Sequence, residues 1–173
     1  VVRVAHAPDN PVRVRVGGKV DRVDVAEVPG GVGFWVIDYK TGRGANYTAA
    51  DLTSFRKLQL PLYALAVEAV LFADRPARPL GLAYWLVTDG GAKRVLPGRQ
   101  PLAWLSDAAA WGKFREQLKS WVATLVTGIR AGDFPLAPRS EHCTDTCRFG
   151  PVCRISQSRA AGKGVPLSLP TAE

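Results

Sequence analysis

The chain has 173 residues, of which 47% are apolar and 22% are charged. This balance predicts one folded domain with a sizeable core and excludes an intrinsically disordered chain. The formal net charge of +8 favours polyanionic partners, because contacts with nucleic-acid phosphates release counterions. The sequence contains no apolar run near the roughly twenty residues that a membrane span requires and no signal peptide, so we expect neither membrane insertion nor export.

The first forty residues have the pattern of β-strands. Alternating segments at 1–4, 12–16 and 20–25 predict three short strands separated by proline and glycine. A Pro-Gly-Gly turn at 29–31 leads into the segment 33–38, whose continuous apolar character is typical of a strand in the middle of a sheet. We therefore expect the strands at 20–25 and 33–38 to be neighbours.

The middle of the chain combines a helix with a hairpin. Apolar residues recur at helical spacing from Leu52 to Ala66, where Pro61 could kink or restart the helix. The apolar segment 80–87 predicts a further strand, and a turn at 89–91 connects it to another strand at 93–96.

A long amphipathic helix is predicted near the C-terminus. Ser106 can cap its start and Gly132 can end it. Trp111 and Trp121 lie on its apolar face, so we interpret them as core residues rather than platforms for stacked bases. The apolar face consists of Trp111, Phe114, Leu118, Trp121, Leu125 and Ile129.

Two short blocks carry the residues that phosphodiester hydrolysis requires. These blocks lie on the two strands that we expect to be neighbours, and they are Gly18-Lys-Val-Asp21 and Ile37-Asp-Tyr-Lys40. Asp21 and Asp38 are hard oxygen ligands suited to Mg²⁺ or Mn²⁺. Asp38 and Lys40 are two residues apart, so in an extended strand both side chains leave the same face and can meet at one phosphate.

Three more groups can support that site. The backbone carbonyl of Tyr39 can complete the metal ligands. Gln59 and Tyr63 are four residues apart and share one face of a helix, where they can contact Lys40 or a phosphate. Taken one at a time, these residues are explained as strand ends and the polar edge of a core helix. The ordered combination in a strand, turn, strand, loop and helix context is what predicts a site.

The three cysteines Cys143, Cys147 and Cys153 lie close together near the C-terminus. An odd, clustered number is a poor disulfide framework and is typical of a metal or iron–sulfur site in a reducing compartment. A zinc ion held by these cysteines and His142 is the alternative to an iron–sulfur cluster. His6 is interpreted as a solvent-facing residue.

The combined motifs resemble the RecB-like branch of the PD-(D/E)XK nuclease superfamily, and most closely the nuclease domain of AddB-type subunits of bacterial helicase-nuclease complexes. The resemblance is carried by Gly18-Lys-Val-Asp-Arg-Val-Asp24, by the run from Ile37 to Gly42, and by Gln59 and Tyr63. It implies metal-ligand roles for Asp21 and Asp38, a catalytic role for Lys40 and an accessory role for Gln59 and Tyr63. Asp24 is the weaker candidate, since it projects differently from Asp21.

The resemblance also implies an α/β fold with a restriction-endonuclease-like core, in which helices flank a central mixed sheet and a C-terminal cysteine cluster is attached. Cys143, Cys147 and Cys153 would hold a [4Fe–4S] cluster whose fourth ligand lies outside this chain, although the Cys-x3-Cys spacing is one residue longer than the usual pattern. We expect a nuclease domain over residues 1–155 and a flexible tail over 156–173. Because the sequence contains no methionine, we expect Val1 to be an internal position of a longer polypeptide.

The implied function is a Mg²⁺- or Mn²⁺-dependent deoxyribonuclease, an exonuclease acting with a helicase partner in DNA repair and recombination. The implied location is the cytoplasm, associated with the nucleoid. Two alternatives remain open at this point. One is a CRISPR-associated RecB-like iron–sulfur exonuclease, and the other is a noncatalytic module that binds DNA ends.

Overall fold

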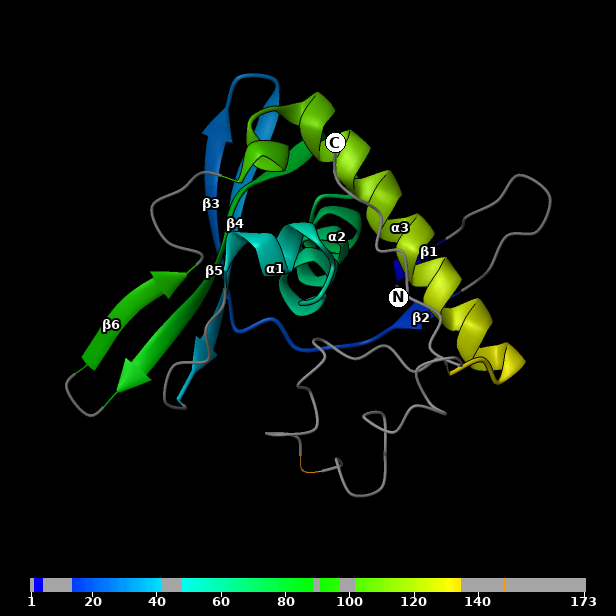
Figure 1. Cartoon of the computed structure of the whole chain (residues 1–173). Coiled ribbons are helices and arrows are strands. Elements are labelled where there is room, and N and C mark those ends of the chain that lie inside the picture. Colours follow the sequence, from blue (N-terminus) through cyan, green and yellow to red (C-terminus); the bar gives the residue numbers. More distant parts are fainter. Residues whose placement is uncertain are drawn as a thin grey trace. The chain divides into compact units, whose positions relative to one another are not determined.

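The computed structural model describes residues 2–4, 14–41, 48–88, 91–96, 102–134 and 148. Backbone contacts divide the chain into two units with a boundary between Leu125 and Val126. The fold described below belongs to the first unit, except for the last residues of α3, which belong to the second. Its elements in chain order (Figure 1) are β1 (Val2–Val4), β2 (Val14–Val16), β3 (Arg22–Val28), β4 (Gly31–Lys40), α1 (Ala49–Thr53), α2 (Gln59–Leu71), β5 (Ala77–Thr88), β6 (Gly91–Leu96), the 3₁₀ turn η1 (Ala103–Leu105) and α3 (Ala108–Ala131).

A mixed four-stranded sheet in the order β3-β4-β5-β6 forms the centre of the unit. β3 and β4 form an antiparallel hairpin, β4 and β5 pair in parallel, and β6 returns antiparallel to β5. The parallel pair needs a crossover connection, which α1 and α2 supply. β1 and β2 form a separate antiparallel pair. The expected mixed sheet with flanking helices is therefore confirmed for the described residues, whereas the cysteine segment lies outside them.

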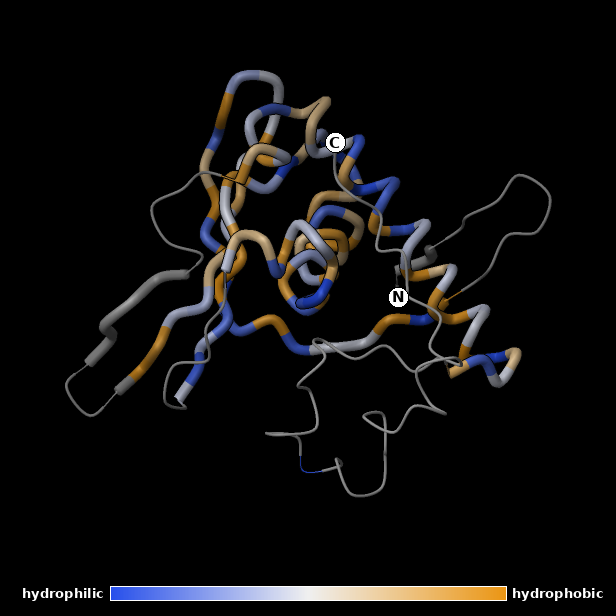
Figure 2. Tube along the Cα trace, viewed as in Figure 1, coloured by the Kyte–Doolittle hydropathy of each residue, from blue (hydrophilic) through white to orange (hydrophobic). Residues whose placement is uncertain are grey.

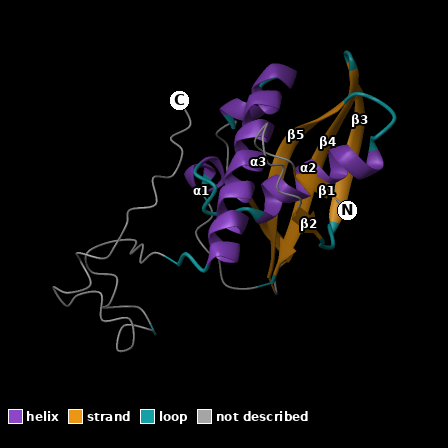
Figure 3. Ribbon diagram, turned by 90° about the vertical axis from the view of Figure 1, so that its right-hand side faces the viewer, coloured by secondary structure: helices purple, strands orange, loops and turns teal. Residues whose placement is uncertain are grey.

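β4 is the central strand, and its two faces differ in burial. Val32, Phe34 and Val36 are at most 1% exposed, because they point toward the face that the helices cover. Trp35 and Tyr39 point to the other face and are 41% and 39% exposed. Figures 1 and 3 show α1, α2 and α3 on the same side of the sheet. Every residue of β4 that faces the helices is therefore inside or at the edge of the core.

Two helices occupy the region from Leu52 to Ala66, for which the sequence predicted helical spacing with a kink or a restart at Pro61. The restart agrees with the structure, because α2 begins at Gln59. α1 ends at Thr53, and Phe55 takes a positive φ of 54° that interrupts the helical path. Pro61 does not kink α2. It lies in the first turn, where the backbone N–H groups have no partner within the helix, so proline costs no hydrogen bond there.

α3 is capped one residue later than predicted. The Asp107 carboxylate, not Ser106, accepts a hydrogen bond from Ala110 N at 2.8 Å. Gly132 ends the helix at a positive φ of 73°, as expected. Hydrophobic and hydrophilic residues alternate along α3 in Figure 2, as an amphipathic helix requires. Ile129 is 57% exposed, so its predicted place in the core is wrong.

An aromatic cluster joins α3 to the rest of the unit. Trp104 stacks on Phe114 with ring centroids 3.8 Å apart, and Phe114 also contacts Phe55 at 5.1 Å. Trp111 is 2% exposed and Trp121 is 8% exposed. The interpretation of the helix tryptophans as core residues is confirmed.

None of the helices in the described ranges combines the length and apolar character that crossing a membrane requires.

Candidate active site

The two aspartates of the sequence motifs lie at the same end of the β3–β4 hairpin. The antiparallel ladder ends at the pair of Arg22 and Ile37, and Asp21 and Asp38 are the next residues along the two segments. The exposed Asp21 carboxylate accepts a hydrogen bond from Tyr39 N at 2.9 Å, which ties the start of β3 to the end of β4.

Asp38 is the one buried charged residue of the described core, with 3% of its surface exposed. Its Oδ1 atom accepts a hydrogen bond from Gln59 Nε2 at 2.8 Å. Its Oδ2 atom is buried without a hydrogen bond and lies 2.5 Å from Lys40 Nζ. The carboxylate therefore keeps one oxygen that is neutralised by a nearby charge but not saturated by donors.

Lys40 lies two residues after Asp38 on the same face of β4, as the spacing predicted. Its Nζ atom donates to Gln59 Oε1 at 3.0 Å and lies over the ring of Tyr84 at 5.2 Å. Tyr84 belongs to β5, where the parallel register sets it beside Asp38. The lysine side chain is 28% exposed. Its ammonium group is thus held from three sides while solvent still reaches the side chain.

Gln59 is the connecting residue of the site. It begins α2, so its amide lies next to the strand ends and contacts Asp38 and Lys40 with opposite ends of the same group. Gln59 Nε2 also donates to Tyr63 Oη at 3.1 Å, one helical turn later. The sequence predicted that Gln59 and Tyr63 share a helix face, and the structure places Gln59 against the Asp38 carboxylate and Tyr63 against Gln59.

Gly18 fixes the place of the Tyr63 ring. A Cβ atom at Gly18 would lie 3.0 Å from Tyr63 Cε1 and 3.6 Å from its hydroxyl oxygen. A side chain here would therefore push the ring that contacts Gln59. The glycine was visible in the sequence as part of a motif, but its partner was not.

Asp24 and the Tyr39 side chain are not part of this cluster. Asp24 forms a bidentate pair with Arg22 at 2.7 and 2.8 Å on the opposite face of the sheet, and these hydrogen bonds lower the pKa of its carboxyl. The Tyr39 ring packs edge-on against Trp85 on that face, with centroids 6.3 Å apart. The weaker ranking of Asp24 agrees with this geometry, and only backbone atoms of Tyr39 are available near Asp21.

The donor set fits a hard divalent cation. The described residues contain no group of three or more histidine, cysteine or acidic side chains arranged around one point. Mg²⁺ needs only one or two carboxylates, because it retains several water ligands. The chemistry of the donor set supports a cation, because Asp38 Oδ2 is buried beside the Lys40 ammonium group without a hydrogen bond, and the exposed Asp21 carboxylate lies at the same end of the hairpin. Asp21 and Asp38 would hold the ion.

Several predicted residues lie outside the described part of the chain. These are the cysteines Cys143, Cys147 and Cys153, the histidines His6 and His142, the turn Asp89-Gly90 and the tail 156–173. Tyr84 is a residue of the candidate site that the sequence did not predict. It appeared only as one of many apolar positions in a strand, and its place beside Asp38 depends on a parallel register that the sequence does not encode locally.

Comparisons with known proteins agree with the geometry. A model of the PD-(D/E)XK nuclease superfamily matches residues 2–154, which include both motif blocks and α2. Comparison with curated proteins and with solved structures gave no match. The chain therefore belongs to the PD-(D/E)XK nuclease superfamily, and this membership implies hydrolysis of phosphodiester bonds.

Proposed function

We propose that the chain is a Mg²⁺- or Mn²⁺-dependent deoxyribonuclease whose site consists of Asp21, Asp38, Lys40, Gln59 and Tyr63. One observation carries the proposal. The buried Asp38 carboxylate and the Lys40 ammonium group lie 2.5 Å apart at the end of β4, and the single amide of Gln59 contacts both.

The chain's own groups divide the chemistry among them. A divalent cation bound by Asp21 and Asp38 would neutralise charge on the scissile phosphate and acidify water. Lys40 Nζ can orient the attacking water and place positive charge beside the phosphate as negative charge grows. Gln59 keeps the lysine and the aspartate in one geometry, and Tyr63 limits the movement of Gln59. Burial of Asp38 strengthens each of these charge interactions.

The motif combination supports a RecB-like enzyme of the AddB type that degrades linear DNA together with a helicase partner. The net charge of +8 is consistent with a nucleic-acid substrate. In this proposal Cys143, Cys147 and Cys153 provide three ligands of a [4Fe–4S] cluster, and the enzyme works in the cytoplasm at the nucleoid.

The decisive experiment is Mg²⁺-dependent cleavage by the full-length protein of linear DNA beside covalently closed circular DNA. Asp38→Ala and Lys40→Ala should abolish cleavage, while Lys40→Ala should retain most DNA binding because the lysine acts mainly on the transition state. Asp24→Ala is the matched control, since it removes a nearby carboxylate from the other face of the same hairpin. Wild-type protein that binds DNA but never cuts it would favour a noncatalytic end-binding module.

The cluster has its own test. Cys147→Ser should remove bound iron and lower the thermal midpoint of the full-length protein more than it lowers the cleavage rate of the remaining folded molecules. Iron-free wild-type protein that contains stoichiometric zinc would replace the iron–sulfur assignment by a zinc site.

A further inference from the structure

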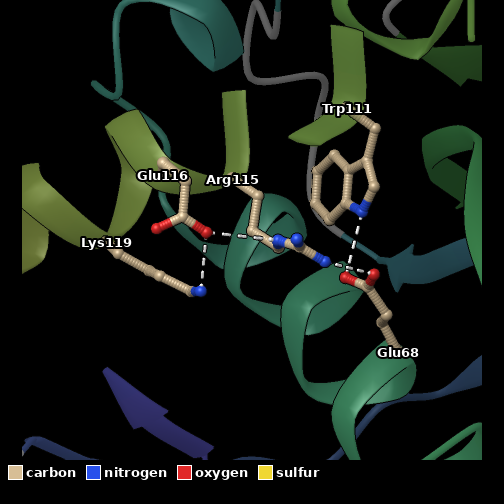
Figure 4. A network of polar contacts seen from close by, with 5 residues as sticks. All are labelled: Glu68, Trp111, Arg115, Glu116 and Lys119. Carbon is tan, nitrogen blue, oxygen red and sulfur yellow. Dashed lines mark hydrogen bonds and ion pairs between the residues drawn. The ribbon is translucent and has the colours of Figure 1, made fainter. Parts of the chain in front are cut away.

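A cavity with basic and apolar lining residues lies at the opposite end of α2 from the candidate active site. It has a volume of about 710 Å³ and is bounded by the second half of α2, the start of β5 and the first half of α3. Leu65, Phe72 and Trp111 provide apolar walls. None of the five proposed catalytic residues lines it. Figure 4 shows the charged side chains from α2 and α3 that meet beside it.

The lining of the cavity contains more basic than acidic residues. Four basic side chains contribute to its lining, and Glu68 is the one acidic residue among them. Glu68 is already saturated, because Trp111 Nε1 donates to its Oε2 at 3.0 Å and Arg115 Nη1 donates to its Oε1 at 2.6 Å. The basic residues are Arg75, Arg78, Arg115 and Lys119.

The described residues satisfy the N–H donors of Arg78 and Arg115 only in part. Arg78 donates to the backbone oxygen of Leu105 at 3.3 Å and forms no ion pair in the described ranges. The nearby Asp107 carboxylate is occupied as the cap of α3. Arg115 Nε is buried without a hydrogen bond and lies 3.4 Å from Glu116. A guanidinium group carries five N–H donors, so both arginines have capacity for an anion.

The other two cations are held only by surface pairs. Arg75 contacts Glu27 at 3.3 Å, where the two side chains are 48% and 77% exposed. Lys119 contacts Glu116 at 2.8 Å, and that carboxylate is 59% exposed. Exposed pairs contribute little free energy, so a bound anion can recruit both cations at small cost.

We propose that this cavity binds a phosphate monoester. A doubly charged phosphate matches the excess of cations, and guanidinium groups bind phosphate oxygens in a bidentate manner. The volume exceeds what phosphate alone requires and lies in the range of small-molecule sites, and the apolar walls can contact a sugar or base. The phosphate can belong to a free mononucleotide or to the phosphorylated end of a DNA strand.

The test is binding to the full-length protein in EDTA, measured by calorimetry and fluorescence anisotropy so that no cleavage is required. The probes are dAMP, deoxyadenosine, inorganic phosphate, and one oligonucleotide with either a 5′-phosphate or a 5′-hydroxyl. We expect saturable binding of dAMP, none of deoxyadenosine, and at least tenfold weaker dAMP binding by Arg78→Gln. Ala69→Trp, which fills the cavity without changing its charge, should have the same effect. Lys113→Gln on the exposed side of α3 is the charge-matched control and should bind like wild type.

The two sources of phosphate give different outcomes. Competition by dAMP against the 5′-phosphorylated strand, with tighter binding of that strand than of its 5′-hydroxyl form, assigns the cavity to strand ends. Equal binding of the two strands with retained dAMP affinity assigns it to free mononucleotides. Equal affinity for dAMP and deoxyadenosine, or wild-type dAMP affinity in both the Arg78→Gln and Ala69→Trp proteins, overturns the proposal. Because cleavage is not the readout, loss of the nuclease assignment would not affect this result.

Discussion

Asp38 and Glu68 are two carboxylates at opposite ends of α2. Asp38 contacts the first residue of this helix, Glu68 belongs to its second half, and each carboxylate is paired with a cation. Glu68 has both oxygens occupied, by the Trp111 indole and the Arg115 guanidinium group. Asp38 has one oxygen bonded to Gln59, while the other lies buried beside Lys40 without a hydrogen bond. The first network is closed and ties α2 to α3, whereas the second leaves an oxygen available to a ligand. We therefore expect the fully hydrogen-bonded pair of Glu68 and Arg115 to stabilise the fold. We expect the incompletely hydrogen-bonded pair of Asp38 and Lys40 to take part in the reaction.

The largest expected difference comes from Asp38→Asn. Cleavage of linear DNA should fall by at least about 10³-fold, because a ligand and a transition-state charge are lost together. The thermal midpoint should change little, because the amide of Asn keeps the hydrogen bond from Gln59 and the Lys40 side chain, which loses its ion pair, is 28% exposed to solvent. Single-turnover cleavage and thermal unfolding measure the two effects. A large loss of stability would show that Asp38 is structural in the same sense as Glu68.

Glu68→Gln should produce the opposite pattern. It removes a charge-assisted hydrogen bond to Arg115, so we expect a loss of about 1–3 kcal/mol in the free energy of unfolding. Urea unfolding measures this loss. The cleavage rate per folded molecule should stay within about twofold of wild type, because Glu68 contacts no residue of the candidate site. A rate that falls as far as in Asp38→Asn would mean that the two networks are not independent.

Gly18→Ala should affect only the network around Asp38 and leave the network around Glu68 unchanged. The new Cβ would press on the Tyr63 ring and disturb Gln59, so we expect about a tenfold slower cleavage, equivalent to about 1.4 kcal/mol. The effect should act through that contact. In a Tyr63→Ala background, which opens the space, Gly18→Ala should have almost no additional effect on rate. Additive losses in the double variant would exclude Tyr63 as the intermediary.

The smallest effect should come from a site that belongs to neither network. The Thr48 hydroxyl oxygen caps α1 by accepting a hydrogen bond from Asp51 N. The Asp51 carboxylate in turn accepts from the Thr48 hydroxyl and backbone N–H, and the hydroxyl hydrogen bond lowers the pKa of Asp51 from its usual value. Thr48→Ala should cost about 1 kcal/mol of stability and leave cleavage unchanged.

The same cap predicts a pH dependence. A carboxyl group whose pKa is lower in the folded state stabilises the protein fully above its unfolded pKa, and that stability is lost as the pH falls through the folded value. Chemical unfolding between pH 6 and pH 3 should therefore show a steeper acid loss for wild type than for Asp51→Asn. If the stability of wild type and of Asp51→Asn fell equally with decreasing pH, the Asp51 cap would make no contribution to the acid loss.

Much of the candidate site could be predicted from the sequence, because short-range spacing determines which of its side chains share a face. Asp38 and Lys40 share a face by the period of a strand, and Gln59 and Tyr63 share a face by the period of a helix. The antiparallel hairpin brought in Asp21, since a turn of fixed length sets its register. These parts of the arrangement follow from local rules.

The features that the sequence did not predict depend on longer-range structure. Tyr84 reaches Lys40 through a parallel pairing whose register depends on the whole α1–α2 crossover. The position of the break between α1 and α2 depends on Phe55, an apolar residue that gives no local stop signal but packs against Phe114 of α3. The exposure of Ile129 follows from where the core ends, which helical periodicity alone cannot locate.

The parallel pairing of β4 with β5 also sets the order in which the protein can acquire its activity during synthesis. All five proposed catalytic residues have been synthesised once Tyr63 has been added, but the strand that carries Tyr84 follows later. A nascent chain that ends between them holds the complete motif without the surface that supports Lys40. Long-range parallel pairing forms slowly compared with local helices and hairpins. The protein would therefore become competent to cut DNA only after its central sheet has closed, which separates translation from nuclease activity in time.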